Sequence, residues 1–536
     1  MKVYNYISML LLAGTAIFAS CSQDEEMSGG NMDSIQGFQI SVLDEGYQSI
    51  DGNKTRATEN DYSTKFAEGD AIGIFAVKGE NVVDEIKNRK FTMQDGLWML
   101  DDGGDPIEYK GSEYQRMSFY AYYPYDENVI FEPAKTDPFE TYISNWKIGE
   151  NQSGGEYTKY DLMTSTGVVE GDRLKGKISF TMKHQMALAV IQMPELVYSF
   201  TNGNIDDYKL PVSVGSFTLN EVEATPYYQE STDTYRFLVN PKKTFSIKGT
   251  YNGVAEMEYT AGGTLDGGTA KMYTINDESK INHTLQVGDY YCADGKIISV
   301  ESETVPENVI GLVCYVGNIQ PSVTHDEYTE TQDALRRDYP NCTHGLVVAV
   351  NYAKYNGANT SVFSPNSRDY FHGNWFSNDE NWAGKFINTD TKTTDSDGVA
   401  AMPFLGYNHT VLMINSPTLV NACEAGVNFV QAYRTDVTAP AVTSDWFLTS
   451  LKELDLLFRL KSTINARLKI VGGEELLEGS RHWSNAERTG NTQIVYQHNF
   501  STGVINDKRR NEGAGYFRMV LAFCFCIYNR LLINIL

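Results

Sequence analysis

Cys21 is the residue of this chain whose position most clearly points to covalent chemistry. It follows an apolar run over residues 7–19, which comes after a basic start at Lys2, and the residues directly before it are small. A basic start, an apolar stretch of about 7–15 residues and a small-residue cleavage site are typical of a secretory signal peptide. The run is too short for a membrane span, which needs about 20 residues. The sequence therefore predicts a signal peptide over residues 1–20 and places the Cys21 thiol beside the cleavage site.

This arrangement resembles the lipobox of bacterial lipoproteins, with Phe18 in place of the usual Leu. The resemblance implies that the Cys21 thiol is acylated and becomes the mature N-terminus. Several acyl chains on one residue anchor a protein stably, because each buried methylene contributes about 0.8 kcal/mol. The acidic residues 24–26 resemble a tag that sends some Gram-negative lipoproteins to the outer face. We therefore expect a surface-exposed lipoprotein of the outer membrane, with residues 21–36 as a lipidated tether. An ordinary secretory signal with an incidental cysteine is the alternative.

The other polar groups of the chain do not form a recognisable catalytic or metal-binding motif. The sequence contains no GxSxG, HExxH or paired CxxC pattern. Glycine-rich residues 262–268 lack the Lys-Ser/Thr ending of a phosphate-binding loop and predict a hairpin turn. His184 stands alone, which favours a hydrogen-bonded structural histidine over a ligand or a base. Residues 395–398 favour a solvated loop over a calcium site. We therefore expect no enzyme activity, no catalytic residue, no metal and no cofactor.

Four cysteines lie in the second half of the chain: Cys292, Cys314, Cys342 and Cys423. Four cysteines allow three disulfide connectivities, and the spacing does not choose among them. Cys524 and Cys526 follow near the end of the sequence and are too isolated to predict a zinc site.

The composition favours several β-rich domains with an acidic surface. The 536 residues exceed what one hydrophobic core serves, so two to three domains are expected. The formal net charge of −25 argues against nucleic-acid binding, because a phosphate-binding surface needs clustered Lys and Arg. Abundant Tyr (34), Phe (25) and Gly (45) are typical of short strands joined by turns. We therefore expect a mainly β fold.

Alternating and strongly apolar segments predict the strands of a first domain over residues 37–150. Apolar and polar side chains alternate over residues 38–42. A turn signal inside residues 66–75 introduces an apolar strand, and Trp98 and the aromatic run 119–124 follow. This ordered series resembles the N-terminal domain of the fimbrillin family, whose members are lipoprotein precursors of type V pilus subunits and tips. The resemblance implies a β-sandwich.

A second block of strands predicts a second domain over residues 151–282. Residues 177–191 have the two-residue period of a half-buried strand, and residues 235–259 contain further strand patterns. The segment from Phe180 through His184 to Leu188 is similar to the second domain of the fimbrillin family. The resemblance implies two tandem β-sandwich domains.

Arg56 occupies a position to which the resemblance attaches a mechanism. In the fimbrillin family a surface trypsin-like protease cuts after an arginine in the N-terminal segment. The cut removes a strand, and an extended strand of the next subunit fills the groove that is left. Such β-strand addition gains affinity from main-chain hydrogen bonds and specificity from alternate side-chain pockets. The resemblance therefore implies maturation between Arg56 and Ala57 with loss of residues 38–51; an ordinary linker arginine is the alternative.

Helical patterns appear in the last part of the chain, over residues 285–523. Residues 418–433 place apolar side chains on one side, and Ser450 with Glu453 predicts a capping box before an apolar stripe. This part resembles a domain often attached to fimbrillin-like proteins, similar to the C-type-lectin-like fold of formylglycine-generating and related domains. The resemblance implies an α+β C-type-lectin-like domain. Residues 524–536 form an apolar, unpatterned tail.

Two tryptophans of this region, Trp375 and Trp382, flank polar loops and are candidate ligand-binding residues. Exposed indole rings stack on the apolar faces of sugars, whereas core packing is the alternative role. The leading hypothesis is a pilus tip or accessory adhesin. Its partners would be other pilus subunits by strand exchange, a maturation protease, the outer membrane through the lipid anchor, and a host or bacterial surface glycan or protein. The alternatives are a surface glycan-binding lipoprotein without a pilus role and a surface enzyme with paired carboxylates.

Overall fold

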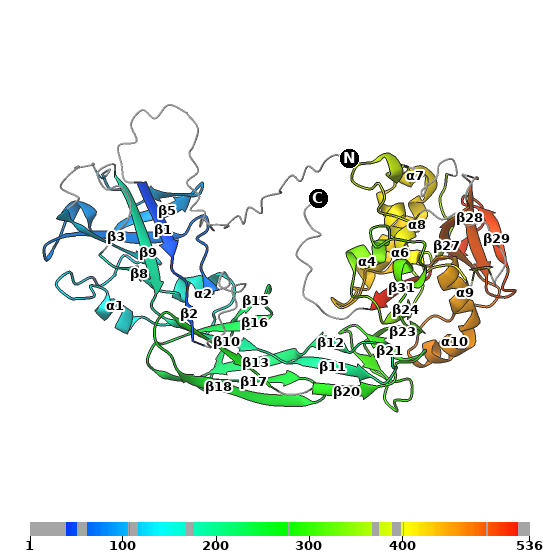
Figure 1. The fold of residues 1–536 in the computed structure, drawn as a ribbon, viewed down its shortest axis with the longest axis horizontal. Helices are drawn as coiled ribbons and strands as arrows, with labels where there is room; N and C mark the ends of the chain where they lie inside the picture. The colour runs from blue at the N-terminus through cyan, green and yellow to red at the C-terminus, as the bar shows by residue number, and fades with distance from the viewer. Residues whose placement is uncertain are drawn as a thin grey trace, which may run out of the picture. The chain divides into compact units, whose positions relative to one another are not determined.

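The computed structural model describes residues 39–50, 62–105, 107, 116–167, 176–276, 279–366, 375–387, 398–399, 401–488, 491 and 493–523 (Figure 1). The described residues form two compact units. The first takes the described residues within 1–48, 54–147 and 161–186, and the second takes those within 49–53, 148–160 and 187–536. The prediction of a mainly β fold is confirmed, because strands dominate both units.

The first unit is built on one eight-stranded sheet. Its strand order is β1 (Gln39–Asp44), β9 (Lys177–His184), β8 (Met163–Ser165), β7 (Ser118–Tyr123), β3 (Ala71–Lys78), β5 (Arg89–Gln94) and β6 (Leu97–Leu100), and β4 (Asn81–Val82) pairs with β3. The helical segments η2 (Asp84–Ile86) and α1 (Glu140–Asn145) belong to the same unit. The pairs from β9 to β6 are antiparallel, whereas β1 pairs with β9 in parallel, from Gln39 opposite Lys177 to Asp44 opposite Met182 (Figure 1).

The turn and strand predicted at residues 66–75 form as expected. Gly69 adopts a φ of +91°, which favours glycine, and Asp70 accepts a hydrogen bond of 2.6 Å from the backbone of Ala67. Gly73 lies where the ring of Tyr122 crosses the sheet, since an added Cβ would lie 2.1 Å from that ring. The glycine in this strand therefore makes room for an aromatic side chain of the core.

The described residues of the second unit form five sheets. The first sheet has the order β15 (Tyr227–Gln229), β16 (Thr234–Val239), β10 (Ala187–Gln192), β19 (Thr269–Thr274), β2 (Gln48–Ser49). The second has the order β12 (Tyr208–Pro211), β11 (Glu195–Phe200), β20 (Ser279–His283). The third has the order β14 (Val222–Ala224), β13 (Ser213–Leu219), β17 (Thr244–Asn252), β18 (Glu256–Thr264). The fourth sheet has the order β22 (Ile297–Ile298), β21 (Tyr290–Cys292), β23 (Val309–Val316), β24 (Gly345–Ala349), β31 (Met519–Phe523), β26 (Phe447–Leu448). The fifth has the order β25 (Thr360–Ser361), β30 (Gly515–Tyr516), β27 (Arg481–Glu487), β28 (Ile494–Asn499), β29 (Ile505–Arg509).

Helices of this unit gather mainly in its later part, as the sequence predicts. They are α2 (Gly155–Tyr160), α3 (Pro321–Thr324), α4 (Ala334–Asp338), α6 (Gly406–Asn415), α7 (Leu419–Ala422), α8 (Glu424–Asp436), α9 (Leu451–Arg459) and α10 (Lys461–Ile470), with η5 (Phe376–Asn378). The capping box of Ser450 and Glu453 is present at the start of α9. The pattern over residues 418–433 divides into two helices at Cys423, whose φ of −150° interrupts the helix.

The hairpin predicted at residues 262–268 is wrong. Gly262 and Gly263 lie inside β18, and the turn at Gly267 and Gly268 leads to β19 in a different sheet, where β19 pairs in parallel with β10. A glycine-rich turn shows that the chain changes direction, but it does not determine which strand the chain joins next.

The unit bounds differ from the expected domain bounds at both places. Residues 161–186 belong to the first unit rather than to a domain over 151–282, because β8 and β9 complete the sheet of β7 and β3. The expected boundary at 282–285 falls inside the second unit, whose buried core continues across it.

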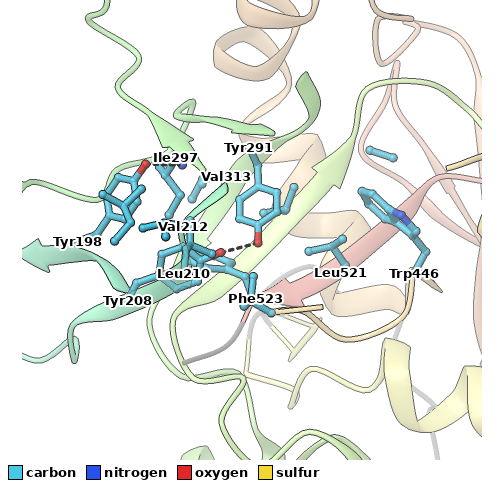
Figure 2. Packing of buried hydrophobic residues seen from close by; sticks show 14 of the residues in the cluster. Tyr198, Tyr208, Leu210, Val212, Tyr291, Ile297, Val313, Trp446, Leu521 and Phe523 are labelled. Atoms are coloured by element: carbon cyan, nitrogen blue, oxygen red, sulfur yellow. Dashed lines mark hydrogen bonds between the residues drawn. The ribbon is translucent and has the colours of Figure 1, made fainter. Parts of the chain in front are cut away.

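That continuous core is visible in Figure 2, where residues of β11 and β12 pack against residues of β21, β23 and β31. The hydroxyl of Tyr208 donates to the carbonyl of Gly295 at 2.8 Å and lies 2.8 Å from the hydroxyl of Tyr291. The ring of Phe523 meets that of Tyr208 edge-on at 5.9 Å. Side chains on either side of residue 283 therefore bury one another.

Candidate functional site

The strand β1 is the terminal strand of the sheet in the first unit and is the element that the predicted maturation would remove. Its side chains alternate between exposed and half-buried, and Ile40 and Val42 pack against the core of the unit. Leu43 faces outward with 65% of its surface exposed. The backbone N–H of Gln39 donates to Gly176 and that of Glu45 donates to Met182, at 2.9 and 3.0 Å. The strand is thus held by one ladder and by two half-buried side chains.

The end of β1 is fixed by a buried polar cluster of Asp44, Tyr47, Asp161 and His184, here called the His184 cluster. Nδ1 of His184 lies 2.8 Å from Oδ1 of Asp161, and Nε2 lies 3.0 Å from Oδ1 of Asp44. The hydroxyl of Tyr47 donates to Asp161 at 2.7 Å, and its ring stacks on the imidazole with centroids 3.8 Å apart. The side chain of His184 is fully buried. A segment near the N-terminus is therefore joined to β9 by ionic and aromatic contacts.

The two carboxylates set the protonation of His184. Burial by itself lowers the pKa of the imidazole, but Asp161 and Asp44 outweigh burial and raise the pKa to about 9. Burial raises the pKa of Asp44, whereas the hydrogen bond and charge of His184 and the backbone N–H groups of Gly46 and Thr64 lower it, and the net pKa is lowered. His184 is consequently a cation and Asp44 an anion at neutral pH.

Sequence reasoning predicted that His184 is a hydrogen-bonded structural histidine, and both of its ring nitrogens do have partners. The sequence does not indicate that those partners are two carboxylates, one of them 140 positions away in the chain. No local pattern signals such a pair, because Asp44 reaches His184 only through the parallel pairing of β1 with β9.

The structure brings together Trp375 and Trp382, which lie seven positions apart in the sequence. Their ring centroids lie 6.5 Å apart with the planes at 72°, and the ring of Trp382 lies 5.5 Å from that of Phe386. Both indoles are half-buried and pack against the core of the second unit. Each therefore has a packed side and an accessible side.

A polar hollow of about 540 Å³ opens on the first unit, lined by Lys90, Asp101, Asp102, Tyr125, Asp126, Glu127 and Asn128. Lys90 reaches Asp101 at 3.1 Å, so part of the negative charge is neutralised locally. Within the described ranges, no group of three or more His, Cys, Asp or Glu side chains is arranged to hold a metal ion. No helix in the described part of the chain is both long and apolar enough to cross a membrane.

None of the three pairings within the four central cysteines forms. Cys292, Cys314 and Cys423 are buried free thiols, and burial raises the pKa of each. Cys342 is disulfide-bonded, and it is not bonded to any of these three thiols. The structure therefore contains none of the three pairings that the sequence leaves open.

Several predicted positions lie outside the described residues. They are the signal peptide over 1–20, Cys21, the tether over 21–36, Arg56 and Ala57, residues 395–397 and the tail over 524–536.

The chain is similar to several known proteins. A family model described as fimbrillin-like matches residues 55–304. A protein of Bacteroides ovatus named as fimbrium tip subunit Fim1C is 31% identical, with 98% of this chain and 100% of that protein covered. The crystal structure of a fimbrial protein from Bacteroides ovatus is similar with a TM-score of 0.59 and 29% identity, covering 92% of this chain and 100% of that one. This chain therefore belongs to the fimbrillin-like family.

Proposed function

We propose that this protein is a cell-surface fimbrial subunit at the tip or in an accessory position, which accepts a strand from another subunit in place of β1. Anchoring by acylated Cys21, cleavage between Arg56 and Ala57, and ligand binding by the later part of the second unit belong to the same proposal. The relative named as a tip subunit, with nearly complete coverage, supports the position.

The observation that best supports strand exchange is the position and packing of β1. It ends the sheet, pairs with a single neighbour in parallel, and has only half-buried side chains facing the core. Arg56 follows it in the sequence, so a cut there separates β1 from the rest of the first unit. Its removal leaves the backbone of β9 unpaired on one side, which is the edge that an extended segment joins in β-strand addition.

The last described strand supports a tip or accessory role rather than a shaft role. β31 lies between β24 and β26, and all five of its residues are buried. A strand that is donated to a neighbour must leave its own sheet, which for β31 means losing two ladders and a buried apolar face. β31 is therefore a strand of the core and not a donor.

Cleavage is tested by sequencing the N-terminus of the surface-exposed protein. We expect the wild-type protein to begin at Ala57, and an Arg56→Ala variant to keep the acylated Cys21 as its N-terminus and to be absent from assembled fibres. Lys54→Ala is the matched control, because it removes a neighbouring positive charge and leaves Arg56 in place. A wild-type protein that begins only at Cys21 contradicts the pilus role and supports a tethered glycan-binding lipoprotein.

Ligand binding is tested by a screen of glycans and matrix proteins with the full chain. For a ligand that binds, we expect Trp375→Ala and Trp382→Ala each to weaken binding by about two- to tenfold, since stacking on an aromatic face contributes about 0.5–1.5 kcal/mol beyond burial. Trp146→Ala, in the other unit, is the control and leaves binding unchanged. Ligands that bind all three variants equally well contradict a role for the tryptophan pair.

A further inference from the structure

The His184 cluster joins the replaceable strand to the sheet through charge as well as through the backbone. We propose that His184 recognises a carboxylate in the strand that occupies the β1 position. The donor strand of the partner subunit would then carry Asp or Glu where Asp44 now lies. This inference rests on the proposed strand exchange and specifies the chemistry of its partner.

Removal of the N-terminal segment takes away half of the cluster. Asp44 and Tyr47 leave with the segment, whereas Asp161 and His184 stay with the first unit. Asp161 continues to occupy Nδ1, and Nε2, which contacted Asp44 at 3.0 Å, faces the vacated position. The accepting groove therefore ends at the imidazole of His184, with Nε2 turned toward the incoming strand and Nδ1 held by Asp161.

An incoming strand meets this donor with whichever residue lies opposite Met182 of β9, as Asp44 does now. A carboxylate restores the contact with Nε2, but an apolar side chain leaves this ring nitrogen buried without a partner. Leaving a buried polar group unsatisfied costs more than losing an exposed hydrogen bond. The cluster thus discriminates among strands through the penalty for a wrong residue as well as through attraction for the right one.

The segment that now fills this position, β1 with the residues after it, shows which other side chains a donor strand needs. Ile40 and Val42 lie four and two positions before Asp44 and supply the half-buried apolar contacts. Tyr47 lies three positions after Asp44 and covers the imidazole with its ring. A matching donor strand reads apolar, any, apolar, any, acid, and an aromatic side chain three residues after the acid completes the match.

The neighbouring carboxylate provides an internal control. Glu45 pairs with Lys183 at 3.3 Å, and both side chains are exposed. Exposed ion pairs contribute little, because water screens them. Glu45 and Asp44 therefore carry the same charge one residue apart, and only Asp44 lies in the cluster.

The experiment uses the full chain with a sequence-specific protease site placed at Arg56. The chain is cleaved at that site, and the N-terminal segment is then removed. Fluorescent peptides of residues 37–50 are titrated by anisotropy in three forms: wild type, Asp44→Asn and Glu45→Gln. We expect Asp44→Asn to weaken binding by about ten- to a hundredfold, as for hydrogen bonds to charged groups. Glu45→Gln should change affinity by less than about threefold.

A double-mutant cycle with the His184→Gln chain isolates the interaction between Asp44 and His184. In that variant, the preference for the wild-type peptide over the Asp44→Asn peptide should disappear. Equal binding of the wild-type and Asp44→Asn peptides to the unsubstituted chain overturns the inference and leaves strand exchange standing. Failure of all three peptides to bind the cleaved chain overturns strand exchange at this site, and the inference with it. The peptide comparison needs no protein variant, so it holds even where His184→Gln does not fold.

Discussion

At the scale of residues, single hydroxyl groups in the core of the second unit join segments that lie far apart in the sequence. Tyr208 is fully buried, and it donates to the carbonyl of Gly295 while Tyr291 donates to it in turn. A buried carbonyl that loses its donor keeps the full cost of leaving water. This chain of hydrogen bonds therefore ties β12 to the loop after β21.

Substitution of Tyr208 tests that role. We expect Tyr208→Phe to lower the free energy of unfolding by about 1–3 kcal/mol, because the ring still fills its site but Gly295 loses its donor. Urea unfolding followed by fluorescence measures the change. Tyr228→Phe is the control: its hydroxyl donates to Asp233 at the surface, so the expected change is within about 0.5 kcal/mol. Equal effects of the two substitutions would refute the role of the buried hydroxyl.

At the scale of elements, the retention of β1 depends on the protonation of His184. The carboxylates that face the imidazole are Asp161 and Asp44, and Tyr47 stacks on it. The pKa of His184 in the folded chain, about 9, exceeds the value of 6.5 for an ordinary histidine, so the protonated form favours the closed cluster. The stabilisation is complete below pH 6.5 and is lost as the pH rises through about 9.

Hydrogen exchange of β1 measures this dependence. Between pH 6.5 and 9 we expect the protection of residues 39–44, corrected for the intrinsic rate, to fall by an amount on the order of 3 kcal/mol. β7 of the same sheet is the control and should keep its protection. His184→Gln should remove the dependence in this window. Parallel losses of protection in β1 and β7 would show that the whole unit loosens and that the cluster is not the cause.

At the scale of the whole molecule, the later part of the second unit shares one of its buried cores with the earlier part. The buried cluster that contains Tyr208 and Leu210 also contains Tyr291, Val313 and Phe523. A fragment of residues 285–523 therefore exposes a face that strands β11 and β12 cover in the full chain (Figure 2).

This arrangement predicts how truncated chains behave. We expect residues 187–523 to give a soluble monomer, and residues 285–523 to aggregate or to melt at a clearly lower temperature. Each large apolar side chain that loses its cover costs about 1.5–3 kcal/mol. Size-exclusion chromatography and thermal melts followed by circular dichroism compare the two fragments. If both melt at the same temperature, the shared core does not contribute to stability.

The sequence by itself determined several of the strands and helices, and also the family. The alternation that predicts β1, the turn at Gly69 and the capping box of α9 are set by residues that are close in the chain, so local patterns reveal them. The family resemblance, which rests on the order of aromatic strands, is borne out by the fimbrillin-like match and by the fimbrial relatives.

Only the tertiary structure decided which segments meet. It paired β1 with β9 in parallel, moved residues 161–186 into the first unit, and continued one core across residue 283. It also brought Asp44 to His184. Such contacts join residues about 40 to 140 positions apart, and a periodic pattern shows that a face is buried without showing what covers it. The candidate site therefore depends on strand pairing, which the sequence pattern leaves undetermined.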